Sequence, residues 1–143
     1  KVFTTFFYSN KKINGSAAEV IIHKLLTENI LHNVEFASID MVREYRLRDL
    51  IHDLQQFSED EVLYIMNNSR IDFLLFNKID KTPVLAIEVD GVSFHEKKLQ
   101  QERDRKKNHI LEIIGLPLLR LSTDGHNEEP RIIECLKAAM HKC

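Results

Sequence analysis

Two stretches of sequence decide the fold: Arg70–Asn77, which reads RIDFLLFN, and Val84–Asp90, which reads VLAIEVD. Both are rich in the β-branched and aromatic residues that favour strands. The segment between them is polar and contains Asp80, Lys81 and Pro83, residue types that are common in turns. The pattern therefore predicts two central strands paired as a β-hairpin.

Helical patterns lie on both sides of this hairpin. From Ser16 the sequence SAAEVIIHKLLTENIL has apolar residues at helical spacing, and Ser16 with Glu19 has the form of a capping box. A long helix is expected from about Glu96 to Ile114, ended by Gly115 and Pro117. The other expected elements are a weaker strand over Val34–Ile39, a helix over Tyr45–Phe57, a short helix capped by Ser58 and Glu61, a strand over Leu118–Ser122 and a terminal helix opened by Pro130.

This order of elements defines the fold class. Helix, strand, inserted helices, two paired strands, helix, strand and helix is an α/β order, with a central four-stranded sheet flanked by helices. The last strand is reached through a helical crossover, which places it parallel to its neighbour. The sheet is therefore expected to be mixed.

Composition narrows the class of protein further. The 143 residues include 43% hydrophobic residues, enough for one core, so residues 1–143 are expected to form a single domain. The chain begins with Lys1 and not Met, which favours a piece of a longer protein. It has no apolar run approaching the roughly 18 residues that cross a bilayer. Cys135 and Cys143 lack metal or disulfide spacing, which favours a reducing, cytoplasmic location.

The hairpin carries acidic residues in a regular pattern. Side chains alternate along a strand, so Glu88 and Asp90 are expected on one face of the second strand. Closing the hairpin around residues 77–83 pairs Phe76 with Val84, Leu74 with Ala86, and Asp72 with Glu88. Directly opposed side chains have Cβ atoms about 4.5–5.5 Å apart, close enough for two carboxylates to share one Mg²⁺. The alternative is a structural ion-pair network in which Arg103, Lys106, Lys107 or Arg120 neutralises Asp72 and Glu88, with Asp90-Gly91 as a simple turn.

The acids belong to a longer motif: Ile71-Asp72-Phe73, then Ala86-Ile87-Glu88-Val89-Asp90-Gly91 with His95, then Asp104, Lys107, Leu111 and Gly115, then Leu119-Arg120. This resembles the PD-(D/E)XK, or restriction-endonuclease-like, superfamily. More narrowly, it is similar to small uncharacterised families with an E-x-D-G-x-x-x-H signature that are related to very-short-patch mismatch endonucleases. The resemblance covers roughly residues 15–122 and is most specific from Asp72 to Arg120.

The resemblance implies a role for each acid. Asp72 and Glu88 match the metal ligands of the superfamily, so Mg²⁺ or Mn²⁺ is the expected cofactor. Glu19 matches an acid of the first helix that reaches the metal site, although its place in the capping box explains it equally well. At position 90, aspartate stands where the superfamily has its usual lysine, and Asp90 is expected to help His95 with positioning and proton transfer. His95 matches a histidine of the related families and could transfer a proton, or it could cap the helix that begins at Glu96.

The long helix supplies polar and basic candidates. Gln101 and Lys107 are expected to contact the attacking water or the scissile phosphate. Because the net charge is −2, a polyanion is expected to bind only at a local basic patch. The candidates for sequence-independent contacts to DNA phosphates are Lys97, Lys98, Arg103, Arg105, Lys106 and Arg120. Arg120 has an alternative role, a salt bridge to Asp104.

Taken with the resemblance, the sequence indicates a metal-dependent DNA endonuclease domain. The resemblance also implies a helicase or other DNA-processing domain in the same protein, and a homodimer, since many nucleases of this fold dimerise. Two alternatives stay open: a catalytically inactive nucleic-acid-binding or scaffold module that keeps the nuclease fold, and a protein-interaction domain of a larger enzyme.

Overall fold

The computed structural model describes residues 17–90, 97–122 and 127–141. In chain order its elements are α2 (Ala17–Lys24), a π-helical segment η1 (Leu25–Ile30), a 3₁₀ turn η2 (Val34–Phe36), β1 (Ile39–Arg46), α3 (Leu47–Leu50), α4 (Glu59–Met66), β2 (Arg70–Asn77), β3 (Pro83–Asp90), α5 (Lys97–Ile113), β4 (Leu118–Ser122) and α6 (Glu128–Met140). No helix within these ranges is both long and apolar enough to cross a membrane.

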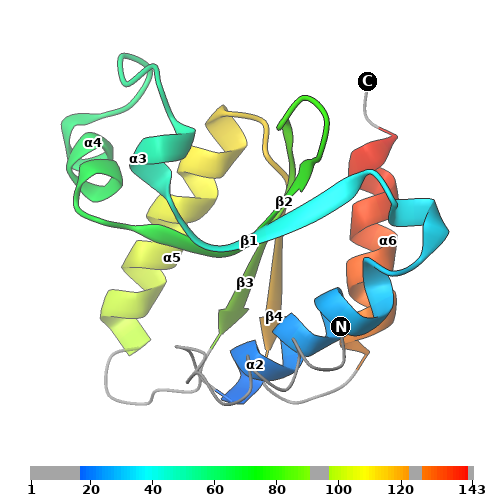
Figure 1. Ribbon diagram of the computed structural model, residues 1–143. Coiled ribbons are helices and arrows are strands. Elements are labelled where there is room, and N and C mark those ends of the chain that lie inside the picture. Colours follow the sequence, from blue (N-terminus) through cyan, green and yellow to red (C-terminus); the bar gives the residue numbers. More distant parts are fainter. Residues whose placement is uncertain (1–16, 91–96, 123–126, 142–143) are drawn as a thin grey trace.

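The strands form one mixed sheet in the order β1-β2-β3-β4. The pairs β1–β2 and β2–β3 are antiparallel, and β4, reached through α5, lies parallel to β3. In Figure 1, α3, α4 and α5 lie on one side of the sheet, and α2 and α6 on the other. The expected fold class is confirmed: an α/β domain with a mixed four-stranded sheet flanked by helices, consistent at this level with a restriction-endonuclease-like fold.

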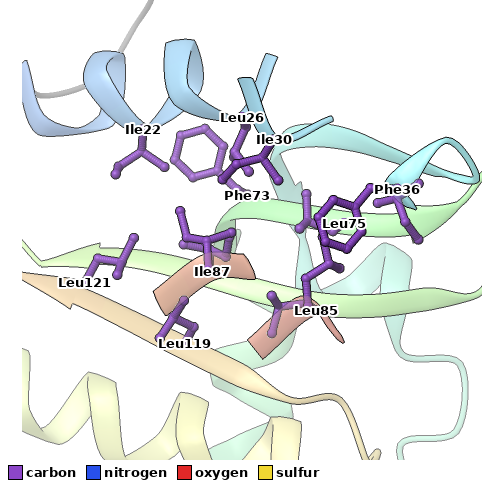
Figure 2. Close-up of a cluster of buried hydrophobic side chains, with 13 residues drawn as sticks. Ile22, Leu26, Ile30, Phe36, Phe73, Leu75, Leu85, Ile87, Leu119 and Leu121 are labelled. Atoms are coloured by element: carbon purple, nitrogen blue, oxygen red, sulfur yellow. The ribbon is translucent and has the colours of Figure 1, made fainter. Parts of the chain in front are cut away.

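Alternating side chains divide the core between the two faces of the sheet. On the α2 and α6 side, Phe73, Leu75 and Ile87 from the central strands pack with Leu26 and other residues of the N-terminal helical segments, as Figure 2 shows. On the α5 side, Leu74 and Ala86 pack with residues of α3, α4 and α5, among them Leu47, Ile65, Ile110 and Leu111. Helices on both faces therefore hold the hairpin in the middle of the domain.

The hairpin register is largely as expected. Leu74 is opposite Ala86, and Phe73 is opposite Ile87. The predicted pair of Phe76 with Val84 is wrong, because the register shifts between Leu75 and Phe76 and places Phe76 opposite Pro83. The shift lies at the turn end of the hairpin, so the pairing that leads to Asp72 and Glu88 is unaffected.

The first strand begins later than the pattern predicts. Instead of a strand over Val34–Ile39, the chain makes a 3₁₀ turn, started by the Asn33 side chain, which accepts the N–H of Glu35 at 3.0 Å. The strand β1 follows it. Its pairing with β2 skips Glu44, which has a left-handed φ of +50° and an ion pair to Arg70 at 3.7 Å.

The helix predicted over Tyr45–Phe57 is also wrong. Tyr45 still pairs with Ile71 in the sheet, and only Leu47–Leu50 is helical. The apolar residues do face the core, since Leu47, Ile51 and Phe57 are all buried. Ile51 and Phe57, however, lie in irregular chain that follows the single helical turn. Apolar residues at helical spacing indicate that one side of a segment is buried, and here a mostly irregular segment buries the same side.

Other predicted boundaries are close to those observed. Gly115, with φ of +74°, follows the end of α5 as expected. The terminal helix begins at Glu128, two residues before Pro130. The expected capping box of the first helix includes Ser16, which lies outside the described residues.

The predicted capping box of α4 is confirmed. Ser58 Oγ accepts the N–H of Glu61 at 3.2 Å, and Glu61 Oε1 accepts the N–H of Ser58 at 3.0 Å. Replacing Ser58 by Ala removes one of these acceptors, so the free energy of unfolding is expected to fall by about 1 kcal/mol. Urea denaturation measures the change. Ser58→Thr, which keeps the hydroxyl, serves as the control and should lose less than half as much.

Candidate functional site

The site begins where the β2–β3 ladder ends. Within the described residues, backbone pairing of the two strands stops at Phe73 and Ile87. Beyond that point the N–H of Asp72 donates to Glu88 Oε2 at 2.7 Å, and the N–H of Val89 donates to Asp72 Oδ2 at 2.9 Å. Each carboxylate thus accepts a backbone N–H of the other strand, which holds Asp72 and Glu88 side by side as the register predicts.

Glu88 is the one buried charged residue in the part of the chain that the structure describes, with 6% exposure. Its counter-ion is Lys107 of α5, whose ammonium contacts Glu88 Oε1 and donates to the Arg70 carbonyl at 2.7 Å. Burial raises the pKa of Glu88, and the nearby Lys107 opposes that rise. The structure therefore brings Lys107 to the acid pair from α5, a contact that the sequence analysis named under the ion-pair alternative.

Asp72 has a second acidic neighbour. Its pKa is raised from 3.8 to about 6; burial is the main cause, and the Glu19 carboxyl, within hydrogen-bonding reach, also contributes to the rise. Glu19 lies on α2, which covers the opposite face of the sheet from α5. This end of the hairpin therefore gathers Glu19, Asp72, Glu88 and Lys107.

Asp90 belongs to a neighbouring network. Arg120 Nη1 lies 3.3 Å from an oxygen of Asp90 and 3.3 Å from an oxygen of Asp104. The same guanidinium donates to Asn108 Oδ1 at 2.8 and 3.1 Å. Burial raises the pKa of Asp90, and Arg120 opposes the rise. Arg120 thus ties the ends of β3 and β4 to α5, which is the salt-bridge role that the sequence left open, and its guanidinium is engaged by protein acceptors.

The remaining described candidates on α5 are exposed or have other partners. Gln101 is exposed and lines a shallow surface hollow with Lys98 and Arg105. Arg105 pairs with Glu102, and Lys106 pairs with Asp60 of α4 at 2.8 Å. Arg103 is exposed. His95 and the side chain of Lys97 lie outside the residues that the structure describes.

Two contributors were missed by the sequence analysis. The Arg70 carbonyl that accepts from Lys107 is a backbone group, for which the sequence carries no signal. Asn108 was detectable in principle, because it follows Asp104 by one helical turn and so faces the same Arg120.

The carboxylates of this site are candidate ligands for a metal ion. Across residues 17–90, 97–122 and 127–141, no group of three or more His, Cys, Asp or Glu side chains is arranged to hold an ion. Mg²⁺, however, is commonly held by one or two carboxylates, with water and substrate phosphate as its other ligands. Asp72 and Glu88 are two adjacent, largely desolvated oxygen donors, and the residues present therefore fit Mg²⁺ or Mn²⁺.

Fold and site together define a class: an α/β domain with a partly buried acid pair and a lysine where its central hairpin ends. Residues 15–140 match the family described as "Protein of unknown function (DUF2726)", and the chain belongs to that family. No curated protein and no solved structure matches the chain.

Proposed function

We propose that this domain is a metal-dependent endonuclease that hydrolyses phosphodiester bonds in DNA, with Asp72, Glu88 and Lys107 at its centre. One observation carries the proposal: two carboxylates and an ammonium meet in a largely buried site at the end of the hairpin. That combination suits a divalent cation on the acids and a phosphate beside the lysine. The resemblance to the PD-(D/E)XK superfamily supports the same reading.

Each residue has a defined task in this proposal. Bound Mg²⁺ would supply Lewis acidity toward the phosphate and lower the pKa of a water molecule. Asp72 and Glu88 hold the cation, and the N–H groups of Val89 and Asp72 keep both carboxylates in place. The Lys107 ammonium has three N–H donors: the Arg70 carbonyl accepts one, and Glu88 accepts a second while no cation is bound to it. The third can donate to a phosphate oxygen and offset the charge that develops there.

The lysine missing from position 90 is the main departure from the superfamily pattern. Lys107 compensates for it, because it delivers an ammonium to Glu88 from α5 and not from the strand. Asp90 is then free for another task, which is to hold Arg120 and through it α5. His95 is the residue that the resemblance assigns to proton transfer.

The proposed partner is DNA, contacted through its phosphates. Lys98 and Arg103 are exposed on α5, the helix that carries Lys107. Contacts of this kind are independent of base sequence and weaken with salt. A cytoplasmic location, a helicase or other DNA-processing partner domain and a homodimer complete the proposal.

The test combines Mn²⁺ calorimetry with plasmid nicking on the parent, Asp72→Asn and Asp80→Asn. Asp80 lies in the hairpin turn, at the other end of the strands from the site, and its replacement changes the net charge equally. We expect Asp72→Asn to lose metal binding and to nick at least about 100-fold more slowly, while Asp80→Asn matches the parent. Equal nicking by Asp72→Asn and the parent would refute the proposal.

The second candidate is a non-catalytic nucleic-acid-binding module. Its support is that Lys107 already pairs with Glu88, and Arg120 already pairs with both Asp90 and Asp104, as in a structural ion-pair network. Salt-sensitive DNA binding without nicking in Mg²⁺ or Mn²⁺ would favour this candidate over the nuclease. Failure to bind DNA or RNA at low salt would point instead to a protein-interaction domain.

A further inference from the structure

The contact of Lys107 with Glu88 affects how a metal ion can bind at this site. Its ammonium lies against Glu88 Oε1, the oxygen that remains after Oε2 has accepted the N–H of Asp72. Only 11% of the Lys107 side chain and 8% of the Glu88 side chain are exposed. The ion pair therefore occupies Oε1 of the Glu88 carboxylate, and a metal ion bound to the same oxygen would lie beside the ammonium.

An ammonium and a metal ion on the same carboxylate oxygen would repel each other. A buried charge needs a partner at close range, and the ammonium of Lys107 meets that need for Glu88. A divalent ion on the same oxygen would stand beside a like charge in a poorly screened environment, where repulsion is strong. Either the ion stays out or the ammonium moves.

We propose that Lys107 is an exchangeable counter-ion: it neutralises Glu88 while no metal is bound, and metal binding displaces it from Oε1. The proposal rests on the proposed metal site. The second acceptor of the ammonium, the Arg70 carbonyl, lies outside the acid pair and can retain Lys107 at the rim of the site after it leaves Glu88. Lys107 thereby sets metal affinity, a role separate from any contact it makes with phosphate.

The first test is Mn²⁺ titration by calorimetry on the parent, Lys107→Met and Lys137→Met. Met keeps the length of the side chain and removes the competing charge. Lys137 is the matched control, because it pairs with Glu35 at 3.4 Å on the α6 side of the sheet and its replacement changes the net charge equally. We expect Lys107→Met to bind Mn²⁺ at least about tenfold more tightly than the parent, with Lys137→Met within about twofold of it. Weaker or equal Mn²⁺ binding by Lys107→Met would overturn the proposal that metal binding displaces Lys107.

A second measurement needs no variant, in case Lys107→Met does not fold. The parent is treated with acetic anhydride with and without saturating Mn²⁺, and modification of each lysine is read by mass spectrometry. Displacement from Glu88 exposes the Lys107 amine, so its modification rate should rise with Mn²⁺ while that of Lys137 stays constant. An unchanged rate at Lys107 would contradict the proposal.

The two proposals fail in different ways. If Lys107→Met binds Mn²⁺ more tightly and the parent does not nick DNA, the displacement of Lys107 by metal stands and the proposed nuclease activity is refuted. If the parent nicks DNA and Lys107→Met binds Mn²⁺ more weakly, the proposed nuclease activity stands and the displacement of Lys107 by metal is refuted.

Discussion

Lys107→Met is expected to lower the free energy of unfolding by about 3–5 kcal/mol at pH 8 in EDTA. The substitution leaves the Glu88 carboxylate buried without its counter-ion, and an unpaired buried charge is far more costly than the intact pair. Urea denaturation followed by circular dichroism measures the change. The Glu88→Gln/Lys107→Met double variant has no buried charge at these positions and should recover most of the lost stability.

Lys137→Met again provides the control, since its pair with Glu35 is half exposed on both sides. Its loss should change stability by less than about 0.5 kcal/mol. If the double variant were no more stable than Lys107→Met, the cost would come from lost packing of the lysine stem and not from the isolated charge.

Asp72→Asn is expected to stabilise the metal-free protein by about 2 kcal/mol at pH 8, even though it removes a residue of the proposed site. The pKa of Asp72 is raised from 3.8 to about 6 in the fold, so its ionisation costs more there than in the unfolded chain. Below pH 3.8 both states hold the proton and no penalty arises. As pH rises from about 4 through 6 the penalty grows, and above pH 6 it is complete.

The measurement is the difference in unfolding free energy between Asp72→Asn and the parent in EDTA, from pH 4.5 to pH 8. The difference should be small at the acidic end and reach its full value near pH 7. Asn keeps an oxygen to accept the N–H of Val89 and gains an N–H to donate toward Glu19. A destabilised Asp72→Asn at pH 8 would mean that Asp72 is paired more strongly than its burial and neighbours indicate.

The central hairpin could be predicted from sequence because its signal is local. The strand over Arg70–Asn77 was predicted with its observed bounds, and Leu118–Ser122 likewise. A strand that is covered on both faces of its sheet is apolar along most of its length, so a long apolar run between polar turns predicts such a strand. Once the register was set, Asp72 had to lie beside Glu88, so the acid pair followed from the fold.

The edge of the sheet could not be predicted in the same way. The strand β1 reads IDMVREYR and carries charges along its length, so it lacks the apolar run that marked the central strands. The adjacent segment, with Leu47 and Ile51, has helical spacing without being a helix beyond one turn. In both places tertiary contacts with β2 and α5 decide the structure, and the local sequence is ambiguous.

The site was predictable only in part. Lys107 was a candidate as one of the polar and basic residues of the long helix, and the structure brings its ammonium to Glu88. Asp90 shares a face with Glu88 in the sequence pattern, but its partner is Arg120. That choice depends on how β4 and α5 meet, which no spacing along one strand can reveal.

The left-handed residue in β1 bears on how the protein behaves at high concentration. A strand at the end of a sheet is a template on which another chain can add, the first step toward aggregation. Glu44 breaks the regular backbone of this edge, and the Asp40 carboxylate already accepts the N–H of Met41 at 2.8 Å. Exposed charges at Asp40 and Glu44 would also repel a second copy of the same edge. The irregular backbone at Glu44 and the exposed charges of β1 are therefore expected to disfavour pairing of two copies along this edge of the sheet.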